Sequence, residues 1–341
     1  MRIGITYNLK SDIKPARGIS FPKDLSEEYD QPETIESIKE ALQTDGHEVY
    51  LLGGDLAIIE KIKRHAVEFV FNMAEGFYGR NREAMIPALL ELLSVPYSGS
   101  DPTALSATLD KSIAKRIALS LGIQTPEFWV LDAISDLAQV SGRFPLFAKP
   151  LWEGSSIGIL NSSRVENQIQ LEREAKRLFE HYPEEPVLVE TYISGREFTV
   201  AVIGNKQPEV FGIMEISFSD SKSRDFCYTL EVKRNWKETV NYYVPPNLSE
   251  NEKKTLEDHA LKLFRTLRLR DVARFDFRMG TNGKFYFLEV NPLPGLSPES
   301  GDIVILAGKM GLSYRELILK IVNAAFERYP NLSQLKKNKV K

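Results

Sequence analysis

Short apolar runs alternate with amphipathic stretches through the first hundred residues. The runs at Arg2–Tyr7, Glu48–Leu52 and Glu68–Asn72 predict strands, because each is short and bounded by polar or turn-forming residues. Apolar positions at helical spacing predict three helices in the same region, at Glu33–Thr44, Leu56–Arg64 and Arg82–Leu93. This alternation is typical of a parallel sheet covered by helices. The long polar insert Asn8–Gln31 interrupts it after the first strand, and inserts of that length are usually functional or disordered.

The pattern changes after a cluster of turn formers at residues 96–102. Beyond it the chain predicts helices at Ala104–Leu121, Arg164–Glu180, Glu250–Leu267 and Tyr314–Tyr329. It predicts strands at Phe128–Leu131, Phe144–Lys149, Val187–Tyr192, Glu197–Ile203 and Val210–Ile216. The polar segment Ser217–Thr239 is expected to be a mobile loop. We therefore predict an N-terminal α/β domain and two α+β subdomains followed by a solvated tail, at residues 1–102, 103–185, 186–330 and 331–341.

The most informative stretch predicts a β-hairpin near the C-terminus. Asn282-Gly283 is a strong signal for a two-residue hairpin loop. With that loop, Asp276 lies opposite Glu289. By the same count, Arg274 lies opposite Asn291. Side chains two apart on a strand share a face, so these four point the same way. The opposite, core-facing side is predicted to carry Phe275, Phe277, Leu288 and Val290.

The polar face of this hairpin has the composition of a magnesium site. Two carboxylates set opposite each other repel unless a cation lies between them. Two carboxylates and one amide oxygen suit Mg²⁺ completed by phosphate oxygens better than they suit zinc. The alternative is a surface face on which Arg274 simply neutralises Asp276 and Glu289. Pro292 and Pro294 favour the metal site, because they stiffen a loop that a plain surface hairpin would not need.

A second segment has the composition of a phosphate loop. Glycines and hydroxyls at residues 154–158 follow a predicted strand that ends at Lys149, and backbone amides in such a turn can bind an anion. Lys149 can meet a phosphate as a point charge, and Lys111 belongs to the same region. The segment matches neither the Walker A pattern nor the dinucleotide fingerprint, so a nicotinamide dehydrogenase is not supported.

Composition narrows the function classes. The 341 residues are 43% hydrophobic and 27% charged, as is usual for a globular protein, with a net charge of −3. No overall basic field suggests nucleic acid as a partner. The single Cys227 excludes an internal disulfide and a cysteine-rich zinc site, which fits the cytoplasm. No signal-peptide core and no apolar run of spanning length occurs, so no membrane association is expected.

Taken in order, the motifs resemble the D-alanine–D-alanine ligase branch of the ATP-grasp superfamily. The resemblance covers roughly residues 96–325 and rests on Pro-Tyr-Ser-Gly-Ser, Asp-Lys, Phe-Ala-Lys-Pro, Glu-Gly-Ser-Ser-x-Gly, Val-Glu-Thr-Tyr-Ile-Ser-Gly-Arg-Glu, Arg-Phe-Asp-Phe and Leu-Glu-Val-Asn-Pro-Leu-Pro-Gly. It implies an ATP-grasp fold: a Rossmann-like pre-ATP-grasp domain and two α+β subdomains that clasp ATP. It also implies ATP and Mg²⁺ as cofactors, with two metal ions and with Mn²⁺ as a substitute.

The resemblance also implies roles for individual residues. Those on the nucleotide side are Lys111, Lys149, Ser155, Ser156, Glu190, Tyr192, Ile193, Glu197, Lys233 and Leu288. The metal ligands are Asp276, Glu289 and Asn291. Arg274 and the Gly295 N–H would stabilise the oxyanion, Ser155 would act beside them, and Ser300 would bind the acceptor's carboxylate.

The chain departs from the family pattern where amino acids are selected. The family's Gly-Gly-x-Ser-x-Glu turn is absent, and Glu27 or Glu28 falls nearest to the glutamate that grips the first ammonium group. The family's His-Gly-x-x-Gly-Glu-Asp-Gly segment is replaced by residues 72–83, which include Glu75 and lack the histidine. The arginines near these changes are candidates for binding extra substrate carboxylates or are surface residues: Arg80, Arg82 and Arg234.

The expected activity is therefore an ATP-dependent carboxylate–amine ligase that works through an acyl phosphate and releases ADP and phosphate. Its partners would be amino acids or small peptides, and the choice between D-alanine and another substrate stays open. Members of the family are usually dimers, which implies a homodimer. The alternative from another class is a nucleotide-binding protein that kept the fold without catalysis. Arg274 argues against it, because a pure binder has no use for an oxyanion arginine.

Overall fold

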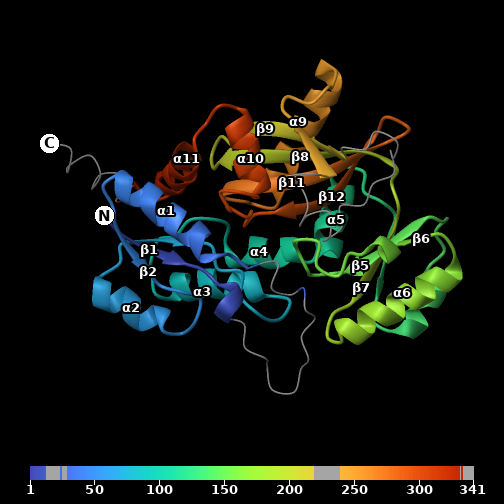
Figure 1. Ribbon diagram of the computed structural model, residues 1–341, viewed down its shortest axis with the longest axis horizontal. Helices are drawn as coiled ribbons and strands as arrows, with labels where there is room; N and C mark the ends of the chain where they lie inside the picture. The colour runs from blue at the N-terminus through green and yellow to red at the C-terminus, as the bar shows by residue number, and fades with distance from the viewer. Residues whose placement is uncertain (13–23, 25–28, 219–238, 331, 333–341) are drawn as a thin grey trace.

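Three β-sheets organise the chain in the computed structural model, which describes residues 1–12, 24, 29–218, 239–330 and 332 (Figure 1). They follow one another along the chain as an N-terminal, a central and a C-terminal sheet, and the central sheet extends to Thr191. The N-terminus lies on the side of the molecule away from the central sheet (Figure 1). The resulting mixture of one parallel and two antiparallel sheets confirms the predicted α/β and α+β fold class.

The N-terminal sheet is parallel, as its βαβ pattern predicts. Its strands follow the order β2-β1-β3 and are Arg2–Thr6 (β1), Glu48–Leu51 (β2) and Phe69–Asn72 (β3). Its helices are Pro32–Thr44 (α1), Ile58–His65 (α2) and Met85–Leu92 (α3), with short 3₁₀ turns at Lys10–Asp12 (η1) and Arg82–Ala84 (η3). The side chains of Ile3 and Ile5 are fully buried, which shows that helices or loops cover the sheet on the face they occupy.

The central sheet is antiparallel and has the order β4-β7-β5-β6. Its strands are Phe128–Leu131 (β4), Leu146–Pro150 (β5), Arg164–Val165 (β6) and Val187–Thr191 (β7). Helix α6, Gln168–His181, packs on it through Leu171 and Leu178, and short 3₁₀ turns occur at Ile134–Gln139 (η4) and Asn161–Ser163 (η5). The predicted helix from Arg164 is corrected at its start, because Arg164 and Val165 pair with β5 and Asn167 caps the helix.

The C-terminal sheet has the order β10-β9-β8-β11-β12 and helices on both faces. Its strands are Gly195–Gly204 (β8), Glu209–Phe218 (β9), Val240–Tyr243 (β10), Asp271–Gly280 (β11) and Phe285–Asn291 (β12). Helix α9, Glu250–Thr266, packs on one face with Phe198 and Phe275. Helices α10, Asp302–Lys309, and α11, Tyr314–Glu327, pack on the other face with Ala201 and Met214. A capping box of Ser249 and Glu252 begins α9.

The long helix predicted at Ala104–Leu121 is two helices. Pro102–Leu109 (α4) ends at Asp110, whose extended backbone (φ −80°, ψ 96°) breaks the helix. The Asp110 carboxylate then accepts hydrogen bonds from the backbone N–H groups of Ser112 and Ile113 and caps Lys111–Ser120 (α5). Apolar periodicity continues through the break, so the pattern alone does not reveal it. The consequence is functional, because Lys111 becomes the first residue of a helix.

The hairpin has a different loop from the predicted one and yet the predicted register at its polar face. Gly280 donates its N–H to the Lys284 carbonyl, so the loop has three residues and not two. A β-bulge between Asp276 and Phe277 restores the pairing, and Asp276 lies opposite Glu289. The bulge also corrects the core face: Phe287 is fully buried there, whereas Leu288 is turned to a cavity.

Contacts from outside the hairpin hold the strand at the bulge. Phe287 donates its N–H to the Gln124 carbonyl at 2.8 Å and accepts a hydrogen bond from the Thr125 hydroxyl at 2.8 Å. Both partners are more than 160 residues away in the sequence. The register of the polar face therefore depends on a long-range contact that a count from the turn cannot include.

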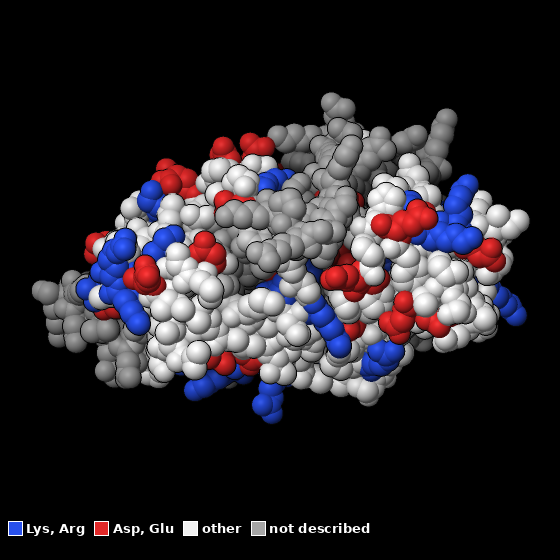
Figure 2. Space-filling model, turned by 90° about the horizontal axis from the view of Figure 1, so that it is seen from below, with Lys and Arg blue, Asp and Glu red and all other residues white. Residues whose placement is uncertain are grey.

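No helix among the described residues is long and apolar enough to span a membrane. On the face seen in Figure 2, Lys and Arg side chains are interspersed with Asp and Glu side chains. They form no continuous basic surface on that face, which agrees with the net charge of −3.

A buried ion pair joins the first boundary segment to the C-terminal sheet. The fully buried Asp271 pairs with Arg328 at 2.7 Å and accepts the Gly99 N–H at 2.7 Å and the Asn205 amide at 3.0 Å. We expect Asp271→Asn to lower the free energy of unfolding by about 3 kcal/mol, because it leaves a buried guanidinium without its counter-charge. Urea denaturation measures this change.

The matched control is Glu257→Gln, which removes the acid of an exposed pair with Lys253 at 3.9 Å on α9. That change is expected to cost less than about 0.5 kcal/mol. Equal effects of the two substitutions would contradict the importance assigned to the Asp271–Arg328 pair.

Candidate functional site

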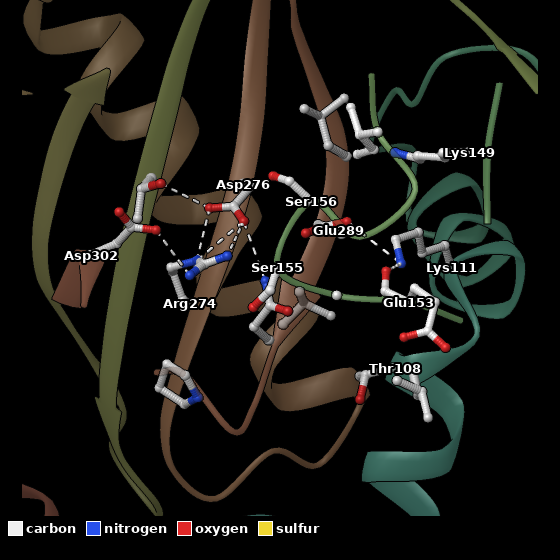
Figure 3. Close-up of a pocket in the computed structure, with 18 of the residues that line it drawn as sticks. Thr108, Lys111, Lys149, Glu153, Ser155, Ser156, Arg274, Asp276, Glu289 and Asp302 are labelled. Carbon is white, nitrogen blue, oxygen red and sulfur yellow. Dashed lines mark hydrogen bonds and ion pairs between the residues drawn. The ribbon is translucent and has the colours of Figure 1, made fainter. Parts of the chain in front are cut away.

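One cavity collects the polar ends of elements from all three sheets. Its walls come from β5 and the loop after it, from β7 and β8, from the β11–β12 hairpin, and from the junction of α4 and α5. Figure 3 shows Arg274 and Asp276 on one side and Lys111 and Glu153 on the other, with Ser155 and Ser156 between them. Residues far apart in the sequence therefore form one site.

Arg274 lies between two carboxylates at the hairpin side of this cavity. It contacts Asp276 through Nη2 at 2.9 Å and Nε at 3.2 Å, and its Nη1 lies 3.0 Å from Asp302 (Figure 3). The Thr199 hydroxyl and the Asn291 amide also donate to Asp276, at 2.8 and 3.3 Å. Burial opposes the charge of Arg274, but Asp276 and Asp302 outweigh it and raise its pKa. The guanidinium is thus held in place and fully charged.

Asp276 and Glu289 respond differently to the same buried surroundings. Burial raises the pKa of Asp276, and the neighbouring Glu289 adds to the rise, despite the opposing effect of Arg274. Burial also opposes ionisation of Glu289, yet Lys111 and Lys149 outweigh it and lower its pKa. The two acids face each other across the β11–β12 ladder. Their repulsion is relieved from opposite sides, by the arginine and by the lysines.

The described lining of the cavity is strongly acidic, with nine acids and four bases. The acids are Asp30, Glu75, Glu83, Glu153, Glu190, Glu197, Asp276, Glu289 and Asp302. The bases are Lys111, Lys149, Arg274 and Arg278. A polyphosphate could not enter so acidic a cavity without cations. Within the described residues no three His, Cys, Asp or Glu side chains converge as a complete metal cage, so phosphate oxygens would have to complete the coordination.

A buried lysine–glutamate–lysine cluster supports the phosphate side. Glu190 lies 2.8 Å from Lys149 and 2.8 Å from Lys115, and all three side chains are buried. Burial opposes ionisation of Glu190, but the two lysines prevail and lower its pKa to about 2. Burial lowers the pKa of Lys115 to about 8, whereas the pKa of Lys149 is raised because Glu190 and Glu289 outweigh its burial. Glu190 thereby fixes Lys149 as a cation in the cavity.

The glycine loop lies across the cavity from the hairpin. Ser155 and Ser156 have positive φ angles of 49° and 61°, a conformation that turns successive backbone N–H groups and is costly for residues other than glycine. Lys111 donates to the Glu153 carbonyl at 2.6 Å at the start of this loop and lies 3.9 Å from Glu289. Lys111 therefore connects the loop with the hairpin acids.

The end of the cavity near β7 and β8 has an aromatic side chain between cations. The guanidinium groups of Arg164 and Arg278 lie 4.5 and 4.9 Å from the ring centroid of Tyr192. Arg278 also lies 4.0 Å from Glu197, whose pKa burial raises in spite of that arginine. Ile193 and Leu288 add apolar surface to this end. A flat ring with a nearby carboxyl group suits a base and a ribose.

Most of the residues predicted from the sequence line this cavity. They are Glu75, Lys111, Lys149, Ser155, Ser156, Glu190, Tyr192, Ile193, Glu197, Arg274, Asp276, Leu288, Glu289, Asn291 and Gly295. The lining does not include Ser300, which is exposed and donates to the Ser297 hydroxyl at 3.1 Å. The lining also lacks Arg80, which pairs with Asp110 at 3.1 Å, and Arg82, which pairs with Glu153 at 3.4 Å. Glu27, Glu28, Lys233 and Arg234 lie outside the described residues.

Four residues of the site were missed from the sequence. Asp302 and Thr199 contact the Arg274–Asp276 pair, and Lys115 contacts Glu190. Asp30, which is two residues after the predicted Glu28 in the sequence, lines the cavity, and a β-bridge with Leu9 holds its backbone beyond the end of β1. Thr199 has a signal, since it pairs with Asp276 on the adjacent strand. The local sequence pattern gives no such signal for Asp302, Lys115 or Asp30, because their places in the site depend on packing between distant elements.

Known proteins resemble this chain over most of its length. The family model described as "D-ala D-ala ligase C-terminus" matches residues 121–323. A D-alanine–D-alanine ligase of Aquifex aeolicus is 33% identical over 292 residues, 85% of this chain and 93% of the relative. An uncharacterised protein of Sinorhizobium fredii is 33% identical over 313 residues, 88% of this chain and 90% of the relative. The crystal structure of a Bacillus anthracis D-alanine–D-alanine ligase complexed with ATP has a TM-score of 0.72 at 24% identity and covers 99% of each chain.

The hairpin acids can be tested directly as metal ligands. We expect Glu289→Gln to weaken Mn²⁺ binding in the presence of ATP by at least about a hundred-fold, because partners one shell further out already change metal affinity by 10–100-fold. Electron paramagnetic resonance of Mn²⁺ measures the affinity. The exposed first-turn acid of α9 provides a control, Glu250→Gln, which should bind the metal normally. Normal Mn²⁺ binding by Glu289→Gln would refute the metal assignment.

Proposed function

The chain belongs to the D-alanine–D-alanine ligase family and is an ATP-dependent ligase that joins a carboxylate to an amine, and from this premise we propose how its residues divide the reaction. The observation that carries the proposal is the convergence of the hairpin acids, Arg274 and the loop lysines on one cavity. Nucleotide, metal and reacting carboxyl group would all meet there.

ATP and Mg²⁺ are the cofactors of the proposed reaction. Two Mg²⁺ ions, or Mn²⁺ in their place, would be held by Asp276, Glu289 and Asn291 together with phosphate oxygens. Lys111, Lys149 and the backbone of Ser155 and Ser156 would hold the phosphates. The aromatic end with Glu190, Tyr192, Ile193, Glu197 and Leu288 would hold the nucleoside. The metal ions supply charge neutralisation for the transferring phosphoryl group.

The reaction would proceed in two steps. A substrate carboxylate oxygen attacks the γ-phosphorus of ATP, ADP leaves, and an acyl phosphate forms. The amine nitrogen of the second substrate then attacks the acyl carbon, loses a proton, and displaces phosphate as the C–N bond forms. Arg274, which Asp276 and Asp302 fix in place, would stabilise the negative charge that develops on the acyl oxygen. The Gly295 N–H would be the second donor, and each such donor typically contributes a factor on the order of 10²–10³ in rate.

The first substrate is proposed to be an amino acid whose ammonium group faces Asp30. This carboxyl group lines the cavity together with Arg274 and Gly295 and has no side-chain hydrogen bond among the described residues. Glu75 lines the same part of the cavity. The acceptor would be an amino acid or a small peptide. Several relatives are named D-alanine–D-alanine ligases, so D-alanine is one candidate substrate. We also propose a cytoplasmic location and a homodimer, both by analogy with the family.

Phosphate release tests the activity and the substrate together. The protein is incubated with ATP and Mg²⁺ and a panel of D- and L-amino acids and dipeptides, and products are identified by mass spectrometry. We expect release that depends on one carboxylate–amine pair and a product heavier than either substrate. Nucleotide binding without release for any pair would favour the non-catalytic alternative. Release with D-alanine alone would identify the dipeptide ligase.

The pH dependence tests the role of Asp30. Burial raises the pKa of this carboxyl group to about 7, against the opposing charge of Lys10. Among the described residues, Glu75 lines the same cavity and Tyr314 interacts electrostatically with Asp30. Burial and the charge of Asp30 raise the pKa of Tyr314, which stays neutral. Only ionised Asp30 can hold an ammonium group, so the KM of the first substrate should rise about ten-fold as pH falls from about 8 to about 6.

Asp30→Asn should bind the first substrate weakly at every pH and lose this dependence. The KM for ATP provides an internal control and should change little in the variant. An unaltered pH profile in Asp30→Asn would assign the titration to another group.

A further inference from the structure

The loop that crosses the cavity is held at both ends by residues of the N-terminal region. This loop, residues 152–158, joins β5 to the rest of the central subdomain and contains Ser155 and Ser156. Neither of the two residues that hold it lines the cavity. Both are therefore distinct from the residues that would touch the nucleotide.

Arg82 holds the start of the loop. Its Nη2 donates to the Trp152 carbonyl at 3.1 Å and to the Glu153 carboxylate at 3.4 Å. The Arg82 side chain is only 3% exposed, so these charge-assisted bonds are shielded from water. Lys111 and Glu185 also bind Glu153: Lys111 donates to its carbonyl at 2.6 Å, and Glu185 accepts its N–H at 3.0 Å. Arg82 thus adds an N-terminal contact to a cluster that fixes the phosphate-binding Lys111.

The backbone that carries Arg82 is tied to the parallel sheet. Gly76 has a φ of +71° and packs so closely on Arg82 that a Cβ there would lie 2.5 Å from the Arg82 carbonyl oxygen. The Gly76 N–H donates to the side chain of Asn8 at 2.9 Å, and Asn8 is buried at the end of β1. A continuous path of direct contacts therefore runs from β1 to the start of the loop.

Asp24 holds the other end of the loop. Its carboxylate accepts the Gly158 N–H at 3.0 Å and the Tyr182 hydroxyl at 2.9 Å. The Gly158 carbonyl accepts from Arg177 of α6 at 2.7 Å, so both peptide groups of this glycine are held. A Cβ at Gly158 would lie 2.6 Å from Pro150, which explains the need for glycine at this junction.

We propose that Arg82 and Asp24 are positioning residues that hold the two ends of the phosphate loop, so that the N-terminal region sets the affinity for the nucleotide. The inference rests on the proposed nucleotide role of the loop. Ser155 and Ser156 adopt left-handed backbone conformations that are unfavourable for residues other than glycine unless their surroundings enforce them. Arg82 and Asp24 supply such enforcement at the start and at the end of the loop.

Titration calorimetry tests this proposal without requiring turnover. It measures the Kd of AMP-PNP with Mg²⁺ in the absence of amino acids. We expect Arg82→Met to raise the Kd at least about ten-fold, because it removes charge-assisted hydrogen bonds from both loop residues. Arg82→Lys should recover part of the affinity, since an ammonium group reaches one acceptor but lacks the planar fork. Asp24→Ala should raise the Kd about three- to ten-fold.

The double variant should lose less affinity than the product of the two single effects, because both residues hold the same loop. Arg270→Met is the matched control: Arg270 pairs with Asp101 at 2.6 Å, outside the cavity lining, and its loss should leave the Kd unchanged. If Arg82→Met does not fold, Asp24→Ala carries the test, because Asp24 lies in a partly exposed turn.

The outcomes separate this inference from the proposed function. Wild-type protein that fails to bind AMP-PNP contradicts the proposed nucleotide site itself. Wild-type binding together with unchanged Kd values and a lower melting temperature in the variants would show that Arg82 and Asp24 serve stability alone, and the inference would be overturned.

Discussion

The opposition of Asp276 and Glu289 is the constraint on which the site depends. Two neighbouring carboxylates are tolerated at a buried position only if cations meet them, and here Arg274 meets one while Lys111 and Lys149 meet the other. Arg274 is in turn fixed by Asp302, and Lys149 by Glu190. The cations therefore hold the acids in place and are themselves held, which gives the site a fixed geometry.

This arrangement explains why a single cavity needs residues from two sheets and from a helix junction. The acids come from β11 and β12, Lys149 from β5, and Lys111 from the break between α4 and α5. No single element could provide both the acids and the opposing lysines without neutralising them in a local pair. Separation across subdomains keeps a gap between the charges, and that gap is the volume in which a polyphosphate with its metal ions would fit.

The sequence predicted the chemistry of the site better than its geometry. Asp276 and Glu289 could be paired from the sequence because strand periodicity is local, yet the prediction held through two compensating differences. The loop is one residue longer than the turn signal indicates, and a bulge held by Gln124 and Thr125 cancels the shift. The break at Asp110 and the roles of Lys115 and Asp302 could not be predicted, since each depends on contacts between elements that the local pattern does not relate.

In the folded chain, one departure from the family pattern contacts the loop at residues 152–158 and does not line the cavity. Arg82 lies in the segment that differs from the family near the amino-acid side, and the sequence left open whether it binds a substrate carboxylate or is a surface residue. In the fold its guanidinium contacts Trp152 and Glu153 at the loop, so altered residues near the substrate end also bear on the nucleotide end. A change of substrate in this architecture would then require compensating contacts to the loop, because the same short segment faces both. Asp30 and Arg82 show the two kinds of position. Asp30 lines the cavity together with Gly295, whereas Arg82 contacts the loop whose backbone would bind the phosphates.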